Sequence, residues 1–244
     1  RHIRPWNTHP SVCRCWAESR SSTGKRSGAY STGVYGVHPY QLLNFNGHWD
    51  DVSTLAHESG HSMHTLLADQ SQPFATSGYS IFIAEIASTL NESLLVHRAL
   101  EEAKKPRERL ALLGERLETL RTTLFRQTMF AEFELAIHER AEKGEALTGE
   151  TLSALYLELV RRYYGHDQGV CHVDDLYGVE WSFVPHFYYD YYVYQYATSL
   201  VASTAITKSI LQEQAQGKTV ARDRYLSLLK SGGSDYPVTL LKRA

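Results

Sequence analysis

The sequence is poor in features that would mark an exported, membrane-spanning or nucleic-acid-binding protein. No run of about eighteen apolar residues is present, and the N-terminal segment lacks the apolar core of a signal peptide. Positive and negative charges nearly balance, with 25 Lys and Arg residues and 27 Asp and Glu residues. We therefore expect a protein that has no membrane and no nucleic acid among its partners.

Cysteine is also scarce, with Cys13, Cys15 and Cys171 in 244 residues. Three cysteines cannot all pair within one chain, so we expect reduced thiols and a cytoplasmic protein. Cys13 and Cys15 could join His2 or His9 around a metal, but a C-x-C pair lacks the spacing typical of zinc sites.

The composition is that of a folded globular protein, with 43% hydrophobic and 21% charged residues. Residues 1–28 show no apolar periodicity, and we interpret them as an irregular arm or remnant. Residues 29–244 are expected to form one mainly α domain that is part of a longer protein. Two short strands are predicted over residues 29–37 and 40–45. Apolar residues spaced three and four apart then predict helices from about residue 50, and over 81–103, 106–143, 150–164, 190–216 and 221–230.

The first predicted helix contains the motif H-E-x-x-H, formed by His57, Glu58 and His61. Residues four apart share a helix face, so both imidazoles can reach one Zn²⁺ ion. Glu58 is placed to take a proton from a metal-activated water without being a ligand. The alternative is a purely structural histidine pair, but half-buried imidazoles on an apolar helix face need a partner such as a metal.

A catalytic zinc needs a third protein ligand and an open position, and the next predicted helix offers Glu85. Ile and Ala residues flank Glu85 on both sides, where an unpaired carboxylate would be costly. A ligand role removes that cost, and a core carboxylate paired with an arginine is the alternative. Glu92 lies two turns further on the same face, where it could accept a hydrogen bond from a ligand imidazole.

Other candidate residues carry weaker signals. His64, one turn beyond His61, and His172, near Asp174, could bind metal but are expected more often to be surface or supporting groups. The pair Gly232 and Gly233 does not form a phosphate-binding loop, because no Lys-Ser or Lys-Thr follows it as that loop requires.

Several motifs occur in a recognisable order along the chain. They are KRSGAYS at residues 25–31, PY at 39–40, LNFNG at 43–47, HESGHSMH at 57–64, AEIASTLNE at 84–92, PHFY at 185–188, YVYQYAT at 192–198 and SGGS at 231–234. Together they resemble the oligoendopeptidase F branch of the thimet-oligopeptidase-like (M3) zinc metallopeptidases. The resemblance implies a mainly α, zincin-type catalytic domain of an elongated helical peptidase over residues 29–244, with a short β-hairpin or small sheet before the zinc-binding helix. It also implies one Zn²⁺ per chain, bound by His57, His61 and Glu85.

A tyrosine-rich segment includes His186, Tyr191, Tyr192, Tyr194 and Tyr196. Phenols near a zinc site can donate a hydrogen bond to the oxyanion that forms on a peptide carbonyl. The resemblance implies Tyr194 as that donor, His186 as an aid to substrate or transition-state binding, and Tyr191 as a substrate contact. Ordinary aromatic packing is the alternative for most of these tyrosines. The segment is shorter than in the thimet branch, which leaves open which tyrosine takes which role.

The predicted activity is that of a zinc-dependent endopeptidase acting on short peptides, with Glu58 as general base. A carboxypeptidase or dipeptidyl carboxypeptidase of the same superfamily is one alternative. An inactive zinc-binding fragment or peptide-binding module is another.

Overall fold

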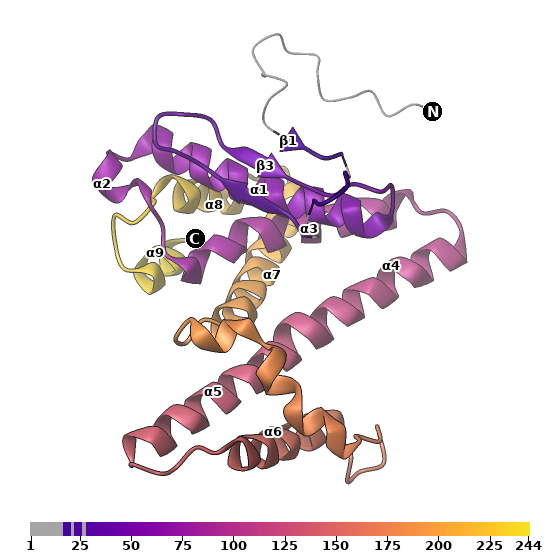
Figure 1. Ribbon diagram of the computed structural model, residues 1–244. Helices are drawn as coiled ribbons and strands as arrows, with labels where there is room; N and C mark the ends of the chain where they lie inside the picture. Colours follow the sequence, from indigo (N-terminus) through magenta and orange to yellow (C-terminus); the bar gives the residue numbers. More distant parts are fainter. Residues whose placement is uncertain (1–16, 21, 26–27) are drawn as a thin grey trace. The chain divides into compact units, whose positions relative to one another are not determined.

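The computed structural model describes residues 17–20, 22–25 and 28–244 (Figure 1). These residues form two compact units. The first holds the described residues up to Ala103 together with 202–244, and the second holds residues 104–201. Helices predominate in both, which confirms the predicted mainly α class. The suggested metal cluster of Cys13 and Cys15 with His2 or His9 lies outside the described residues.

A small sheet in the first unit confirms the strands expected ahead of the histidine-bearing helix. It consists of β1 (Ala17–Glu18), β2 (Tyr30–Thr32) and β3 (Tyr40–Leu42), in the order β1-β3-β2. Strands β2 and β3 are antiparallel with Ser31 opposite Gln41, and β1 runs parallel to β3. Strand β1 was not predicted, because two residues are too few to show an alternating pattern.

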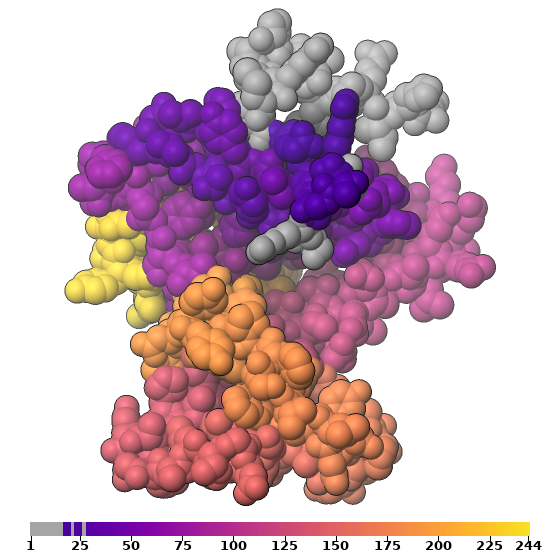
Figure 2. All heavy atoms as spheres, in the orientation of Figure 1, coloured from indigo at the N-terminus to yellow at the C-terminus, as the bar shows by residue number. Residues whose placement is uncertain are grey.

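The sheet lies against helix α1 (Trp49–Ser71), and Figure 2 shows its indigo atoms spread over the purple atoms of that helix. Ser62 of α1 is buried at this contact. Its hydroxyl lies 2.8 Å from the Ser31 hydroxyl and accepts a hydrogen bond from Gln41 Nε2 at 2.7 Å. These hydrogen bonds hold β2 against the part of α1 that carries the H-E-x-x-H motif. Strand β2 lies at the edge of the described sheet.

Local capping sets where the first helices begin. The Asp51 carboxylate accepts the backbone N–H of His48 at 2.8 Å, so α1 begins at Trp49, close to the predicted position. The short helix α2 (Phe74–Ser77) follows. Ser80 then caps α3 (Ile81–Glu102) by accepting the Phe82 N–H at 3.2 Å.

The core of the first unit forms around α3. Eight consecutive residues of this helix, from Ile83 to Leu90, are buried. They pack with residues from α8 (Val220–Lys230), from α9 (Pro237–Arg243) and from the part of α7 that belongs to this unit. The cluster consists of Ile83, Ile86, Ala87, Leu90, Ile206, Tyr225, Leu228, Leu229 and Leu240. Burial of these side chains stabilises the unit, and Glu85 lies within the same buried run of α3.

The second unit contains the helix predicted over residues 106–143. It runs through α4 (Pro106–Thr119), a π-helical segment (Leu120–Phe125) and α5 (Arg126–Glu142). Helix α6 (Gly149–Tyr164) and two 3₁₀ helices (Asp175–Phe183 and Pro185–Tyr188) follow. The core of the unit consists of Met129, Phe130, Phe133, Tyr156, Leu159, Val160, Val173 and Val193.

Helix α7 (Tyr194–Gln214) begins later than predicted. The prediction of a helix from residue 190 is wrong, because Asp190 and Tyr191 have φ values of 35° and 53°. This left-handed conformation is incompatible with a right-handed helix. Among the helices that the structure describes, none combines the length and apolarity needed to cross a bilayer.

Candidate metal centre

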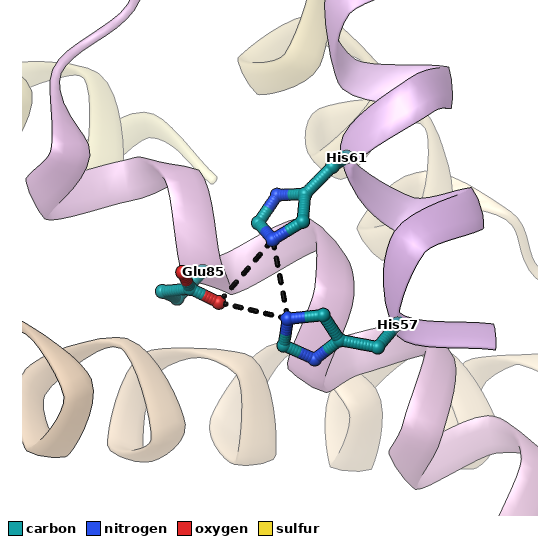
Figure 3. Close-up of side chains that lie close together, drawn as sticks. All are labelled: His57, His61 and Glu85. Atoms are coloured by element: carbon teal, nitrogen blue, oxygen red, sulfur yellow. Dashed lines mark hydrogen bonds and ion pairs between the residues drawn. The ribbon is translucent and has the colours of Figure 1, made fainter. Parts of the chain in front are cut away.

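His57 and His61 face each other on one side of α1 (Figure 3). Their Nε2 atoms are 3.2 Å apart, and the two ring planes are nearly perpendicular. Both residues are partly buried. The helix repeat alone brings them together, since side chains four positions apart lie one above the other.

Glu85 reaches the same point from α3. Its Oε2 atom lies 3.3 Å from His57 Nε2 and 3.5 Å from His61 Nε2 (Figure 3). This approach depends on Gly60 of α1, because a Cβ atom at that position would lie only 2.5 Å from the Ala87 carbonyl oxygen of α3. A glycine therefore lets the two helices pack closely enough for the carboxylate to meet both imidazoles.

The positions of His57 Nε2, His61 Nε2 and Glu85 Oε2 fit those of three ligands of a tetrahedral zinc ion. Ligand atoms at about 2.0–2.1 Å from a tetrahedral ion are about 3.3–3.4 Å from one another. The observed separations of 3.2, 3.3 and 3.5 Å match this edge length. Within the part of the chain that the structure describes, His57, His61 and Glu85 form the one group of three with metal-binding geometry.

The charges of this group favour a cation. Burial raises the pKa of the Glu85 carboxyl, but hydrogen bonds to His57 and His61 outweigh burial and hold the pKa well below its usual range. Burial lowers the pKa of His57, yet the hydrogen bonds to Glu85 and Glu92 raise it to about 10. Two carboxylates thus hold a proton on His57, and a divalent ion bound to Nε2 would replace that proton.

Glu92 lies on the other side of the His57 ring. Its Oε1 atom accepts a hydrogen bond from His57 Nδ1, which leaves Nε2 directed at His61 and Glu85. Such an outer carboxylate fixes the tautomer and orientation of a metal-binding imidazole. Asn91 adds a further link between the helices, because its Nδ2 donates to the Ala56 carbonyl of α1 at 3.2 Å.

Sequence reasoning missed Ser88, which supports Glu85. This fully buried hydroxyl donates to Glu85 Oε2 at 2.8 Å and also lies 3.0 Å from the Glu85 carbonyl oxygen. A serine one turn after the glutamate, within an otherwise apolar run, is the signal that could have identified it.

Glu58 is buried next to the histidines, with 6% of its surface exposed. Its Oε2 atom has no hydrogen-bond partner among the described residues. Burial raises the pKa of this carboxyl, and the charges of His57 and His61 lower it in part. A buried carboxylate with a free oxygen and a raised pKa can both accept and return a proton.

His64 and His172 are not members of the group of three with metal-binding geometry. His64 is fully buried and stacks on Tyr79 with ring centroids 3.6 Å apart, and neither of its nitrogens has a partner among the described residues. His172 is exposed beside His166.

The other predicted site residues belong to the second unit. The His186 ring lies 5.5 Å from Tyr192 and 6.0 Å from Tyr196, measured between centroids. Tyr191 packs on His138, and its backbone N–H donates to the buried Glu134 at 2.7 Å. Tyr194 is the first residue of α7 and has 39% of its surface exposed. The roles of His186, Tyr191 and Tyr194 stay predictions.

Comparisons with known proteins point to one family. The sequence profile of peptidase family M3 matches residues 6–244. The chain is 47% identical to the oligopeptidase PepF of Bacillus subtilis (strain 168) over 229 residues, which are 94% of this chain and 33% of that protein.

Solved structures agree with the sequence matches. A crystal structure from Chlamydophila abortus has 46% sequence identity and a TM-score of 0.79, over 93% of this chain and 37% of that one. The oligoendopeptidase-F of Enterococcus faecium has 44% identity and a TM-score of 0.66, over 80% of this chain and 34% of that one. The chain therefore spans about a third of the length of these relatives.

Proposed function

Because the chain belongs to peptidase family M3, we propose that it is the metal-binding part of a zinc-dependent oligoendopeptidase that hydrolyses short peptides. The observation that carries this proposal is the meeting of His57, His61 and Glu85 at separations suited to one tetrahedral ion. The names of the relatives support oligopeptides as substrates. Cytoplasmic action is part of the proposal and agrees with the small number of cysteines in the sequence.

His57, His61 and Glu85 would hold one Zn²⁺, which when bound supplies a Lewis acid and makes a water molecule acidic enough to be deprotonated near neutral pH. Glu92 and Ser88 keep two of these ligands oriented through the hydrogen bonds described above.

Glu58 takes the proton of the attacking water and delivers it to the departing amine. Its burial favours this exchange, because a carboxyl with a raised pKa is protonated more readily than an exposed one. We assign the tyrosine-rich segment to the oxyanion and the substrate, with Tyr194 as hydrogen-bond donor to the oxyanion, His186 as its aid and Tyr191 as a substrate contact.

A peptide blocked at both ends and carrying a fluorophore and quencher tests the reaction. We expect zinc-dependent cleavage that a chelator abolishes and that Glu58→Gln reduces by at least a thousandfold while zinc stays bound. Cleavage that survives in Glu58→Gln would contradict the assigned base. Cleavage of peptides with a free C-terminus alone would favour a carboxypeptidase, and stoichiometric zinc without any hydrolysis would favour an inactive zinc-binding fragment.

A further inference from the structure

A pocket of about 580 Å³ lies in the first unit beside the C-terminal half of α1. One wall is β2, which lies at the edge of the sheet as described, together with the turn that follows it. The second wall is α1, through Thr65 and Asp69, and the third is the segment of residues 74–79 around α2.

Strand β2 and Gly33, which follows it, run along α1 from the part that carries the H-E-x-x-H motif to this pocket. The Ser31 hydroxyl forms a hydrogen bond with the hydroxyl of Ser62, the residue that follows His61 in the sequence. Two residues further along, Gly33 packs so closely on Thr65 that a Cβ atom there would lie 2.7 Å from the threonine methyl. Two residues of a strand span about 7 Å. A peptide lying along the edge of β2 with one bond at the metal would therefore have a neighbouring side chain at the pocket.

The lining of the pocket suits a positive side chain. The carboxylate of Asp69 is partly buried, and no hydrogen bond or ion pair joins it to another described residue. None of the described residues that line the pocket is Lys or Arg. The rings of Tyr35 and Phe74, which both line the pocket, pack edge to face with their centroids 5.5 Å apart. Phe74 has 76% of its surface exposed. Aromatic rings with one free carboxylate can hold the alkyl stem and the charged head of Lys or Arg.

The SGGS segment holds the third wall in place. The backbone N–H of Gly233 donates to the Thr76 carbonyl at 2.8 Å. Gly232 has a φ of 50°, and a Cβ atom there would lie 2.4 Å from the same carbonyl oxygen. Tyr35 is fixed as well, because its hydroxyl donates to the Gln72 carbonyl at 2.9 Å. The pocket is thus built from braced segments of the first unit.

We propose that this pocket is a subsite for a Lys or Arg side chain of the peptide bound at the candidate metal centre, and that Asp69 determines this preference. The identity of the ligand as a peptide rests on the proposed function. The charge preference rests on the pocket alone.

Binding of labelled hexapeptides, followed by fluorescence anisotropy with a chelator present, tests the subsite without metal or turnover. Three peptides that differ at one position carry Lys, the uncharged analogue norleucine, or Glu. We expect the Lys peptide to bind about fivefold more tightly than the norleucine peptide, the upper range for a partly exposed charge pair. In Asp69→Asn the ratio of the Lys-peptide affinity to the norleucine-peptide affinity should fall to about one. In Asp69→Lys the Glu peptide should bind more tightly than the Lys peptide.

Asp50→Asn is the matched control, because Asp50 lies on the same helix, is exposed and does not line the pocket. It should keep the wild-type ratio. Equal ratios in wild type and Asp69→Asn, or no binding of any peptide, would overturn the subsite. An Asp69-dependent ratio without hydrolysis would contradict only the proposed peptidase function, whereas hydrolysis with no effect of Asp69 would contradict only the subsite.

Discussion

The contact between α1 and α3 at Gly60 predicts a large effect of adding one methyl group. In Gly60→Ala the new Cβ atom would lie 2.5 Å from the Ala87 carbonyl oxygen and 2.6 Å from the Ser88 Cα atom. An ordinary contact of about 3.4 Å requires the helices to separate by about 0.9 Å at this point. Glu85 lies on the displaced turn, whereas metal sites tolerate deviations of about 0.2 Å in their ligand distances.

We therefore expect Gly60→Ala to bind zinc at least tenfold more weakly than wild type. Overpacking costs about 1–3 kcal/mol, against about 1 kcal/mol gained from alanine in a helix, so the free energy of unfolding should also fall slightly. Zinc affinity is measured by competition with a chromophoric chelator, and stability by urea unfolding of the metal-free chain.

Gly114→Ala provides the matched control. Gly114 lies within α4, and a Cβ atom there would have no neighbour within 4 Å. This variant should keep zinc affinity and gain up to about 1 kcal/mol of stability. Wild-type zinc affinity in Gly60→Ala would refute the claim that close packing of α1 and α3 positions Glu85.

Three further predictions follow from the contacts around the centre. Glu92→Gln should weaken zinc binding by about tenfold to a hundredfold, because it weakens the hydrogen bond that orients the His57 ring. The same chelator competition measures this change. Ser88→Ala should weaken zinc binding by a smaller factor in the chelator competition and lower the free energy of unfolding by about 1 kcal/mol in urea, because Glu85 loses a buried hydrogen bond. Burial lowers the pKa of His64 from 6.5 to about 3, so only the unfolded chain binds a proton there between these pH values. The stability of the wild type should therefore fall as pH drops through that range, by up to about 1.4 kcal/mol per pH unit, and His64→Phe should unfold with a shallower pH dependence in urea titrations.

The elements that the sequence predicted well depend on local pattern. Regular spacing of apolar residues marked α1, α3 and the long helix over residues 106–143. The pairing of His57 with His61 follows from the helix repeat, and the apolar neighbours of Glu85 indicated that its carboxylate is buried. Each of these inferences needs only residues close in the sequence.

The features that sequence reasoning missed depend on distances between segments. Gly60 and Ser88 matter because of how closely α1 approaches α3, which no single helix pattern specifies. Asp69 becomes part of a pocket only when β2 and α2 fold beside it. The left-handed turn at Asp190 and Tyr191 also escaped prediction, because neither residue requires that conformation and the buried Glu134 that binds the Tyr191 N–H is far away in the sequence.

Zinc titration by calorimetry, on the wild-type chain and on His57→Ala, His61→Ala, Glu85→Ala and Glu58→Gln, tests the proposed ligand set most directly. Circular dichroism of each variant establishes that it is folded. We predict one zinc ion per chain for the wild type and for Glu58→Gln, and at least a hundredfold weaker binding in each of the three alanine variants. Wild-type zinc affinity in folded Glu85→Ala would contradict the assignment of His57, His61 and Glu85 as the ligands of one ion.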